Sequence, residues 1–349
     1  MSRKRVLHVL ARPGGGGERY ARMLAEGLTD YDHDLDLLTR STKPVKKPAL
    51  GALTRLPALR RKARRHDLIH VHGPGAMLMA FPALRGRPAV FTTHGLHLLS
   101  SATPRSPVAA AGLRRALADG VQVIAVSTSD RDALLAAAPE LADSTTVVLN
   151  GLDIEPAPSG ARSKLRGEWG LTDSTVALLF ISEFADHKQP LQFVDAVEAA
   201  RERGADVAGF LVGDGPLRPE LEARARDRIT VLGPRHDVNA LLAASDAYVL
   251  LALHDGLGLS LLEAMASGRA IVATDIAPNR EPLADTAILV PVGDTDAVAD
   301  AIVELAAKPE LRERLGDAAR RRATEQFSLD RMLRETEAVY ERALAGPSA

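Results

Sequence analysis

Residues 247–268 read AYVLLALHDGLGLSLLEAMASG, and this stretch decides the fold. It opens with a continuous apolar run, 247–253, passes through a loop with two glycines and continues with the spacing of a helix. A continuous apolar run is typical of a parallel strand that helices cover on both faces, because neither face then meets water. The stretch therefore predicts one strand–loop–helix step of an α/β protein.

The same step recurs along the chain of 349 residues. Apolar runs lie at 5–11, 34–39, 67–72, 89–94, 121–127 and 145–150, and again at 175–182, 207–213, 228–232, 247–253, 270–274 and 287–291. Helical patterns lie at 18–28, 129–138, 190–203, 219–226, 238–244, 260–267 and 295–307. This order predicts doubly wound parallel sheets. Eleven or twelve strands exceed one comfortable open sheet, so we expect two such domains.

A linker divides the chain at residues 151–160, which read GLDIEPAPSG and combine Pro and Gly with no periodicity. We therefore predict a first domain at 1–155 and a second at 156–327. Helical patterns continue after the last strand, and Ser328 is expected to cap a final helix at 328–345.

Composition excludes several classes of protein. The chain has no Cys, which excludes disulfides, thiolate catalysis and zinc–thiolate sites. It has no apolar run of membrane-spanning length and no apolar N-terminal run long enough for a signal peptide. We expect a cytoplasmic protein without a nucleic-acid partner. The sequence predicts no oligomeric state.

The net charge of −1 hides an asymmetry. Residues 1–155 hold 22 basic and 14 acidic residues, whereas 156–349 hold 22 and 31. Nine of the basic residues lie between Lys43 and Arg65, without an acidic one. Two interpretations stay open: a patch for an anionic acceptor or for peripheral contact with the inner membrane surface, and an ordinary solvated loop and helix face.

Ligands of doubly wound sheets bind at the carboxyl ends of the strands, so the residues that follow each strand are the candidates. Gly14–Gly17 follow the first strand and lead into a helix, where backbone N–H groups can approach an anion. This loop is neither a dinucleotide motif nor a Walker loop. The alternative is a merely flexible turn.

His94 ends the strand FTTH, where its imidazole could donate to a substrate oxygen or transfer a proton. The alternative is a buried strand histidine. We expect that second role for His8, His70 and His72, with satisfied hydrogen bonds. No H-E-x-x-H motif or other metal-ligand spacing is present.

The second half carries further candidates at strand ends. Lys188 stands before a helix, where an ammonium can meet a phosphate. Gly213 and Gly215 flank a tight turn that is open enough for the backbone to approach a flat base. Asp255 and Glu263 lie eight apart, one in a loop and one a turn inside a helix, so both can accept hydrogen bonds from ribose or sugar hydroxyls. Each feature alone could be incidental, although an acid in the apolar run LSLLEAMA needs a partner.

Taken together and in order, these motifs resemble the family-four retaining glycosyltransferases of GT-B fold, over nearly the whole chain. The stretches that carry the resemblance are GGGERYARMLAEGL, FTTHG, VIAVSTSDRDALL, VVLNGLD, AGFLVGDGPLRPELE, VLGPRHDVNALLAASDAYVLLALHDGLGLSLLEAMASG, ILVPVGDTDAVADAI and FSLDRMLRETEAVYERAL. The resemblance implies two Rossmann-like domains facing across a cleft, with acceptor binding in the first, donor binding in the second, and the last helix packed back on the first.

The resemblance also implies roles for individual residues. Glu263 matches the acid that holds the donor ribose, and Asp255 the acid near the reacting sugar. Lys188 matches the diphosphate-binding lysine, and His94 the histidine that contacts the donor sugar and lies near the acceptor. Leu257, Gly258 and Leu259 match positions whose backbone amides meet the sugar or diphosphate, and Gly15 and Gly16 match glycines beside the phosphates and the acceptor. Gly213 and Gly215 are expected to bind the donor through its base.

Two positions depart from the family pattern. Asp255 stands where the family usually has Glu, which shortens the side chain by one methylene. Glu183 stands where the family has the Arg of its donor loop, and a carboxylate aimed at a diphosphate is repulsive. Either Glu183 turns away and pairs with Lys188 or Arg280, or the donor differs from the usual one.

The resemblance implies a metal-independent, retaining hexosyltransferase without a cofactor, whose donor substrate is a nucleoside-diphosphate sugar. The acceptor would be a small molecule, a glycan or a lipid-linked molecule. Two alternatives stay open: a GT-B relative with another reaction, such as sugar-nucleotide epimerisation or pseudo-glycosidic coupling, and a degenerate, non-catalytic binding subunit.

Overall fold

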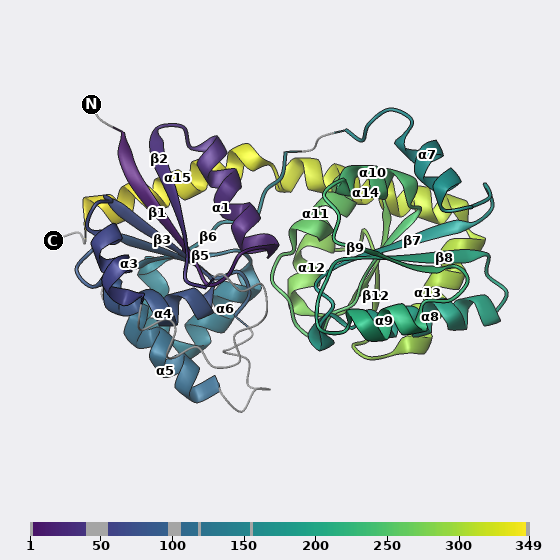
Figure 1. Cartoon of the computed structure of the whole chain (residues 1–349), viewed down its shortest axis with the longest axis horizontal. Coiled ribbons are helices and arrows are strands. Elements are labelled where there is room, and N and C mark those ends of the chain that lie inside the picture. Colours follow the sequence, from purple (N-terminus) through teal and green to yellow (C-terminus); the bar gives the residue numbers. More distant parts are fainter. Residues whose placement is uncertain (1–2, 40–54, 97–105, 118–119, 154–155, 347–349) are drawn as a thin grey trace. The chain divides into compact units, whose positions relative to one another are not determined.

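The computed structural model describes residues 3–39, 55–96, 106–117, 120–153 and 156–346 (Figure 1). The chain forms two compact units. Unit 1 comprises Met1–Asn150 and Leu329–Ala349, and unit 2 comprises Gly151–Ser328.

The described part of unit 1 is built on a six-stranded parallel sheet of order β2-β1-β3-β4-β5-β6. Its strands are β1 (Lys4–Leu10), β2 (Tyr31–Leu37), β3 (Leu68–His72), β4 (Ala89–Thr92), β5 (Gln122–Ala125) and β6 (Thr145–Val147). Its helices are α1 (Gly15–Gly27), α3 (Leu56–Ala63), α4 (Pro74–Leu84), α5 (Ser106–Leu117), α6 (Thr128–Ala137), the 3₁₀ helix η2 (Pro139–Ser144) and α15 (Leu329–Ala345).

Two apolar cores cover the two faces of this sheet. Figure 1 shows α3, α4 and α5 on one side, where their apolar side chains form one cluster with the sheet. α1 and α15 supply the other cluster, to which α15 contributes Met332, Val339 and Tyr340. The last helix of the chain is thus part of the core of unit 1.

The described part of unit 2 repeats the plan with a parallel sheet of order β12-β11-β10-β7-β8-β9. Its strands are β7 (Val176–Ile181), β8 (Val207–Val212), β9 (Ile229–Gly233), β10 (Ala247–Leu250), β11 (Ala270–Thr274) and β12 (Ile288–Val290). Its helices are α7 (Ala161–Glu168), the 3₁₀ helix η3 (Asp186–Lys188), α8 (Pro190–Glu202), α9 (Arg218–Arg224), α10 (Val238–Ala244), α11 (Leu259–Ala266), α12 (Ala277–Leu283), α13 (Thr295–Ala307) and α14 (Pro309–Gln326).

The predicted class, two doubly wound parallel α/β sheets, is confirmed. The prediction for the second strand was wrong at its start: β2 begins at Tyr31, because an edge strand with one accessible face admits the polar residues of YDHDLDL. Several helices were not predicted from the pattern. α4 is apolar all round and contains Pro82, and α12 contains Pro282, so neither shows the expected helical periodicity.

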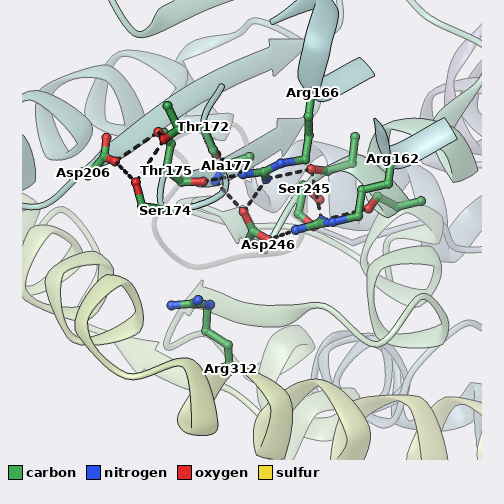
Figure 2. A network of polar contacts seen from close by, with 12 residues as sticks. Arg162, Arg166, Thr172, Ser174, Thr175, Ala177, Asp206, Ser245, Asp246 and Arg312 are labelled. Atoms are coloured by element: carbon green, nitrogen blue, oxygen red, sulfur yellow. Dashed lines mark hydrogen bonds and ion pairs between the residues drawn. The ribbon is translucent and has the colours of Figure 1, made fainter. Parts of the chain in front are cut away.

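The amino end of the unit 2 sheet is held by a buried ionic network, which Figure 2 shows. The carboxylate of Asp246, just before β10, accepts from Arg162 at 2.7 Å, from Arg166 at 2.8 Å and from the backbone N–H of Ala177 at 2.8 Å. Arg166 also donates to the carbonyl oxygens of Thr172 and Thr175. This network ties α7 to β7 and β10, at the edge of the sheet opposite to the carboxyl ends of its strands.

We expect Asp246→Ala to lower the free energy of unfolding of unit 2 by about 3 kcal/mol or more, because it leaves the buried Arg166 without its counter-ion and the N–H of Ala177 without its acceptor. Burial raises the pKa of Asp246, but the N–H of Ala177 and the guanidinium groups of Arg162 and Arg166 outweigh burial and hold it below 3.8. The stabilisation is therefore fully present above about pH 4 and is lost as the pH falls through the lowered pKa.

Urea unfolding of the variant at several pH values measures this effect. Asp206→Ala is the control, since this carboxylate is 48% exposed and its hydrogen bonds are to Ser174 and Thr175. The control should lose less than about 1 kcal/mol. Equal losses in the two variants would contradict the structural role of the Asp246 network.

No described helix is long and apolar enough to cross a membrane. The basic segment 43–65 is described only from residue 55, so its residues 43–54 lie outside the described part. Arg60, Arg61, Arg64 and Arg65 are exposed. Arg55 donates to the carbonyl oxygen of Leu37.

Candidate active site

At the carboxyl edge of the unit 2 sheet, Lys188 and Asp255 form an ion pair. Lys188 ends η3, which follows β7, and Asp255 lies in the loop after β10. Lys188 Nζ lies 2.5 Å from Asp255 Oδ2, and the two side chains are only 16% and 17% exposed. The lysine is therefore held at the sheet edge by a carboxylate that also neutralises it.

The loop after Asp255 leads directly into α11. In this loop the N–H of Gly256 donates to Asp255 Oδ1 at 2.9 Å. Gly258 is the N-cap residue and has no side chain, so the first N–H groups of the helix have no side-chain cap. Such a helix start favours an anion. Leu257 and Leu259, on either side of Gly258, are buried and anchor the loop.

Glu263 lies one turn inside α11 and is 7% exposed. Tyr248 of β10 is fully buried, and its hydroxyl lies 3.0 Å from Ser260 Oγ. Burial raises the pKa of Tyr248, the hydrogen bond with Ser260 lowers it, and the carboxylates of Glu263 and Asp255 raise it.

The turn Gly213–Asp214–Gly215 after β8 packs on the loop after β7. A Cβ at Gly213 would lie 1.8 Å from the carbonyl oxygen of Ser182, and one at Gly215 would lie 2.5 Å from that of Phe184. Phe184 N donates to Asp214 O at 2.9 Å, and Leu217 N donates to Phe184 O at 3.0 Å. Both glycines are therefore required by the packing of two loops, a reason independent of any base.

Two histidines stack beside the Lys188–Asp255 pair, with the rings of His187 and His254 5.0 Å apart and nearly parallel. Burial lowers the pKa of His187, and Lys188 and His254 lower it further, whereas Glu183 and Asp255 act against them. Of the partners expected for Glu183, Lys188 binds Asp255 and Arg280 binds Asp275 through two nitrogens.

In unit 1 the glycine loop begins α1 at Gly15. Gly14 and Gly15 have φ of +81° and +79°, which glycine adopts without strain. Added Cβ atoms at Gly15 and Gly16 would meet nothing within 4 Å, so this backbone is open. Glu18 closes the loop from within the helix, since it accepts from the Gly14 N–H at 2.6 Å.

His94 follows β4 with a φ of +49°, which is unusual for a residue with a side chain. Its ring lies beside the start of α1, because a Cβ on Gly17 would come within 3.7 Å of His94 Cδ2. Its Nε2 lies 3.1 Å from His72 Nδ1. Burial lowers the pKa of His94 to about 4, so the imidazole is neutral at pH 7.

His8, His70 and His72 are buried and hydrogen-bonded. Three of their nitrogens lie within 4.8 Å of one another, a spacing that could hold a metal ion. Both ring nitrogens of His70 are already engaged, by the hydroxyls of Tyr340 and Thr92 at 2.7 Å each. Hydrogen bonding thus uses the nitrogens that a metal would need.

Comparison with known families identifies the chain. The model described as Glycosyltransferase Family 4 matches residues 14–156, and the model described as Glycosyl transferases group 1 matches residues 175–308. The chain belongs to glycosyltransferase family 4. The two matches cover the loops of both units described above, from the glycine loop to α11.

This glycosyltransferase has curated relatives whose names contain different sugar groups. It is 35% identical over 185 residues to the N-acetyl-alpha-D-glucosaminyl L-malate synthase of Bacillus anthracis, a match that spans 51% of this chain and 48% of that protein. It is 29% identical over 306 residues to the alpha-D-kanosaminyltransferase of Streptomyces kanamyceticus, across 80% of this chain and 79% of that one.

Solved structures show that the glycosyltransferase has the GT-B fold. Anabaena Alr3699/HepE, in complex with UDP and glucose, has a TM-score of 0.84 at 21% identity and covers 97% of this chain and 100% of its own. WaaG, a glycosyltransferase involved in lipopolysaccharide biosynthesis, has a TM-score of 0.78 at 16% identity, over 96% and 99% of the two chains.

Sequence reasoning missed three features of the glycosyltransferase: the buried Tyr248 with its hydrogen bond to Ser260, the stacked pair of His187 and His254, and the hydrogen bond between His72 and His94. The first could have been found, because Tyr248 is the one polar side chain in the strand AYVL. The other two depend on contacts between separate loops and strands, which no local pattern records.

Proposed function

We propose that this enzyme is a retaining glycosyltransferase that takes a hexosyl group from a nucleoside-diphosphate sugar without a metal ion. The observation that carries the proposal is the Lys188–Asp255 ion pair beside the uncapped start of α11. An ammonium and a helix N-terminus both favour a diphosphate, and the adjoining carboxylate suits sugar hydroxyls.

Each group in unit 2 then has a distinct task. Lys188 and the backbone of Gly258 and Leu259 hold the diphosphate, which makes it a better leaving group. Asp255 accepts from a hydroxyl of the transferred sugar, and Glu263 accepts from the ribose. Gly213 and Gly215 shape the neighbouring loops.

The reaction breaks the bond between the anomeric carbon and the diphosphate oxygen and forms one to the acceptor oxygen. The transition state resembles an oxocarbenium ion. Attack on the face that the leaving group departs retains the configuration, and a phosphate oxygen takes the proton of the acceptor hydroxyl. Lys188 and the helix N-terminus stabilise the charge that develops on the diphosphate. No side chain of the protein acts as a nucleophile in this scheme.

We assign acceptor binding to unit 1, where His94 and the open backbone of Gly15 and Gly16 lie at the carboxyl edge of the sheet. Three classes of acceptor remain open: a small molecule, a glycan and a lipid-linked molecule. A peripheral membrane contact through residues 43–65 also stays a proposal. The exposed Arg61, Arg64 and Arg65 support it, whereas Arg55 and Arg60, which donate to carbonyl oxygens, do not.

Thermal unfolding with UDP, GDP, ADP and dTDP in the presence of EDTA tests the proposal, followed by incubation with the sugar nucleotides of the base that stabilises. A ligand at a hundred times its Kd stabilises the native state by about 2.7 kcal/mol. We expect one nucleotide to raise the Tm and its sugar nucleotide to release sugar slowly. An α-configured product from an α-configured donor supports retention. Absence of a shift with every nucleotide favours a non-catalytic subunit.

Glu263→Gln is expected to raise the Kd for the stabilising nucleoside diphosphate about thirtyfold, because a carboxylate that accepts from ribose hydroxyls contributes roughly 2 kcal/mol. Inorganic pyrophosphate is the matched control ligand, since it lacks the ribose. Calorimetric titration should show its Kd unchanged. A nucleotide Kd unchanged in the variant would mean that Glu263 does not bind the ribose.

A further inference from the structure

Four imidazole rings form one hydrogen-bonded row in unit 1, from the loop after β4 to the outer strand β2. His94 Nε2 lies 3.1 Å from His72 Nδ1, His72 Nε2 lies 2.9 Å from His8 Nδ1, and His8 Nε2 lies 2.9 Å from His33 Nδ1. The row ends where His33 Nε2 lies 3.1 Å from the carbonyl oxygen of Leu28. Adjacent rings along it are inclined by only 22° to 27°, and their centroids are 5.1 to 5.4 Å apart, as expected for rings that meet edge to edge through a hydrogen bond.

The carbonyl at the end of the row determines which nitrogen of each ring carries the proton. The carbonyl oxygen of Leu28 can only accept, so His33 Nε2 must donate and its Nδ1 must accept. His8 Nε2 therefore donates to His33 Nδ1, and His72 Nε2 donates to His8 Nδ1. His94 Nε2 in turn donates to His72 Nδ1. Four neutral rings supply one N–H each, which is what the four hydrogen bonds require.

Burial keeps the rings neutral. Burial and, to a smaller extent, His33 lower the pKa of His8 to about 3. Burial also lowers the pKa of His72 well below its ordinary value, and that of His33 to a smaller extent. At pH 7 the row therefore has no proton beyond those used in its hydrogen bonds.

We propose that His33, His8 and His72 are positioning residues that hold His94 as the Nε2–H tautomer, so that its Nδ1 lone pair accepts a hydrogen bond from a substrate hydroxyl. The proposal deepens the proposed function, on which the substrate part rests. Among the described residues no hydrogen bond to His94 Nδ1 is present. His94 thus acts as an acceptor at this nitrogen, and a substrate oxygen without a proton would find no donor there.

The row can polarise His94 but cannot carry a proton away from it. Each neutral ring points its N–H away from His94, so the dipoles align and strengthen the acceptor at the far end. An added proton fits only on His94 Nδ1, since every other nitrogen of the row is already used. At the other end of the row, the carbonyl oxygen of Leu28 accepts a hydrogen bond but does not take up a proton.

Nitrogen-15 spectra of the histidine-labelled full-length protein, without any ligand, test the tautomer directly. His94→Asn identifies the His94 signals by their loss. We expect a protonated Nε2 and an unprotonated Nδ1 for His94 at pH 7. A protonated Nδ1 overturns the proposal, whatever the enzyme does with sugar nucleotides, so this result is independent of the proposed function.

Variants of His72 test whether the row sets the tautomer. His72→Phe fills the space but offers no acceptor, so we expect a second, Nδ1–H population of His94 and a kcat/KM roughly tenfold lower. His72→Asn places an amide oxygen where Nδ1 was and should restore the wild-type spectrum and most of the activity. A His94 spectrum unchanged in His72→Phe would overturn the proposal.

His70→Phe is the matched control. His70 lies on the same strand, is equally buried and stacks on His72 at 4.1 Å, but it is bonded to Tyr340 and Thr92 and lies outside the row. It should lower stability and leave the His94 tautomer unchanged. The same spectral change in both variants would assign the effect to general loss of packing and overturn the role of the row.

Discussion

Lys188→Ala is expected to weaken binding of the nucleoside diphosphate at least a hundredfold and to reduce transfer by a similar factor. The variant loses a charge-assisted contact to phosphate and also leaves the mostly buried Asp255 carboxylate without its partner. That carboxylate would then repel the diphosphate at close range. The two losses act in the same direction, so the effect exceeds that of removing a surface lysine.

Asp255→Asn is the informative counterpart, because it should separate binding from turnover. The amide leaves the Lys188 ammonium uncompensated, so UDP or its equivalent should bind as tightly as in the wild type or more tightly. Transfer should nevertheless fall, because the acceptor for a hydroxyl of the sugar is weaker. Calorimetric titration at two salt concentrations, with single-turnover rates, measures both. Weaker nucleotide binding in Asp255→Asn would contradict the proposed division of roles.

Gly213→Ala should lower the free energy of unfolding by about 3 kcal/mol or more and should disturb the loop that carries Lys188. The added Cβ would lie 1.8 Å from the carbonyl oxygen of Ser182, and a backbone atom cannot move aside as a side-chain tip can. The φ of +145° at Gly213 is also unfavourable for alanine. The loops after β7 and β8 would therefore separate.

The control for this variant is Gly204→Ala, which makes the same substitution in the same unit. Gly204 has a φ of +90°, but a Cβ there would meet nothing within 4 Å. It should cost only about 1 kcal/mol, the price of the backbone conformation alone. Urea unfolding, with hydrogen exchange of the amides of 182–188, measures the difference. Equal costs would show that the loops can accommodate the added methyl group.

The strands could be predicted because a strand buried on both faces forms a continuous apolar run in the sequence. TVALLFIS and AYVLLAL are continuous apolar runs, and each contains a strand, Val176–Ile181 and Ala247–Leu250. Helices such as α4 and α12 show no helical periodicity in the sequence, because prolines and, in α4, uniform apolarity hide it. β2 began earlier than predicted because an edge strand tolerates polar residues on its accessible face.

The candidate residues could be chosen from the sequence, but their partners could not. That Lys188 and Asp255 follow β7 and β10 is a local fact, whereas their ion pair requires those two strands to be neighbours. The histidine row likewise depends on the order and register of the strands. β1 lies between β2 and β3, and His8 pairs with His70, two residues before His72. The pattern of one strand does not contain that alignment.

The place of α15 in the core of unit 1 bears on how the chain folds as it is synthesised. One face of the unit 1 sheet is covered partly by residues from the other end of the chain, and Tyr340 bonds to His70 across 270 positions. The sheet of unit 1 is made first, yet that face is covered only by α1 until the last helix leaves the ribosome. Unit 2 has all its residues, Gly151–Ser328, by then and can complete its fold earlier. A chain that stops before α15 would therefore expose apolar surface in its first half and be prone to aggregate there.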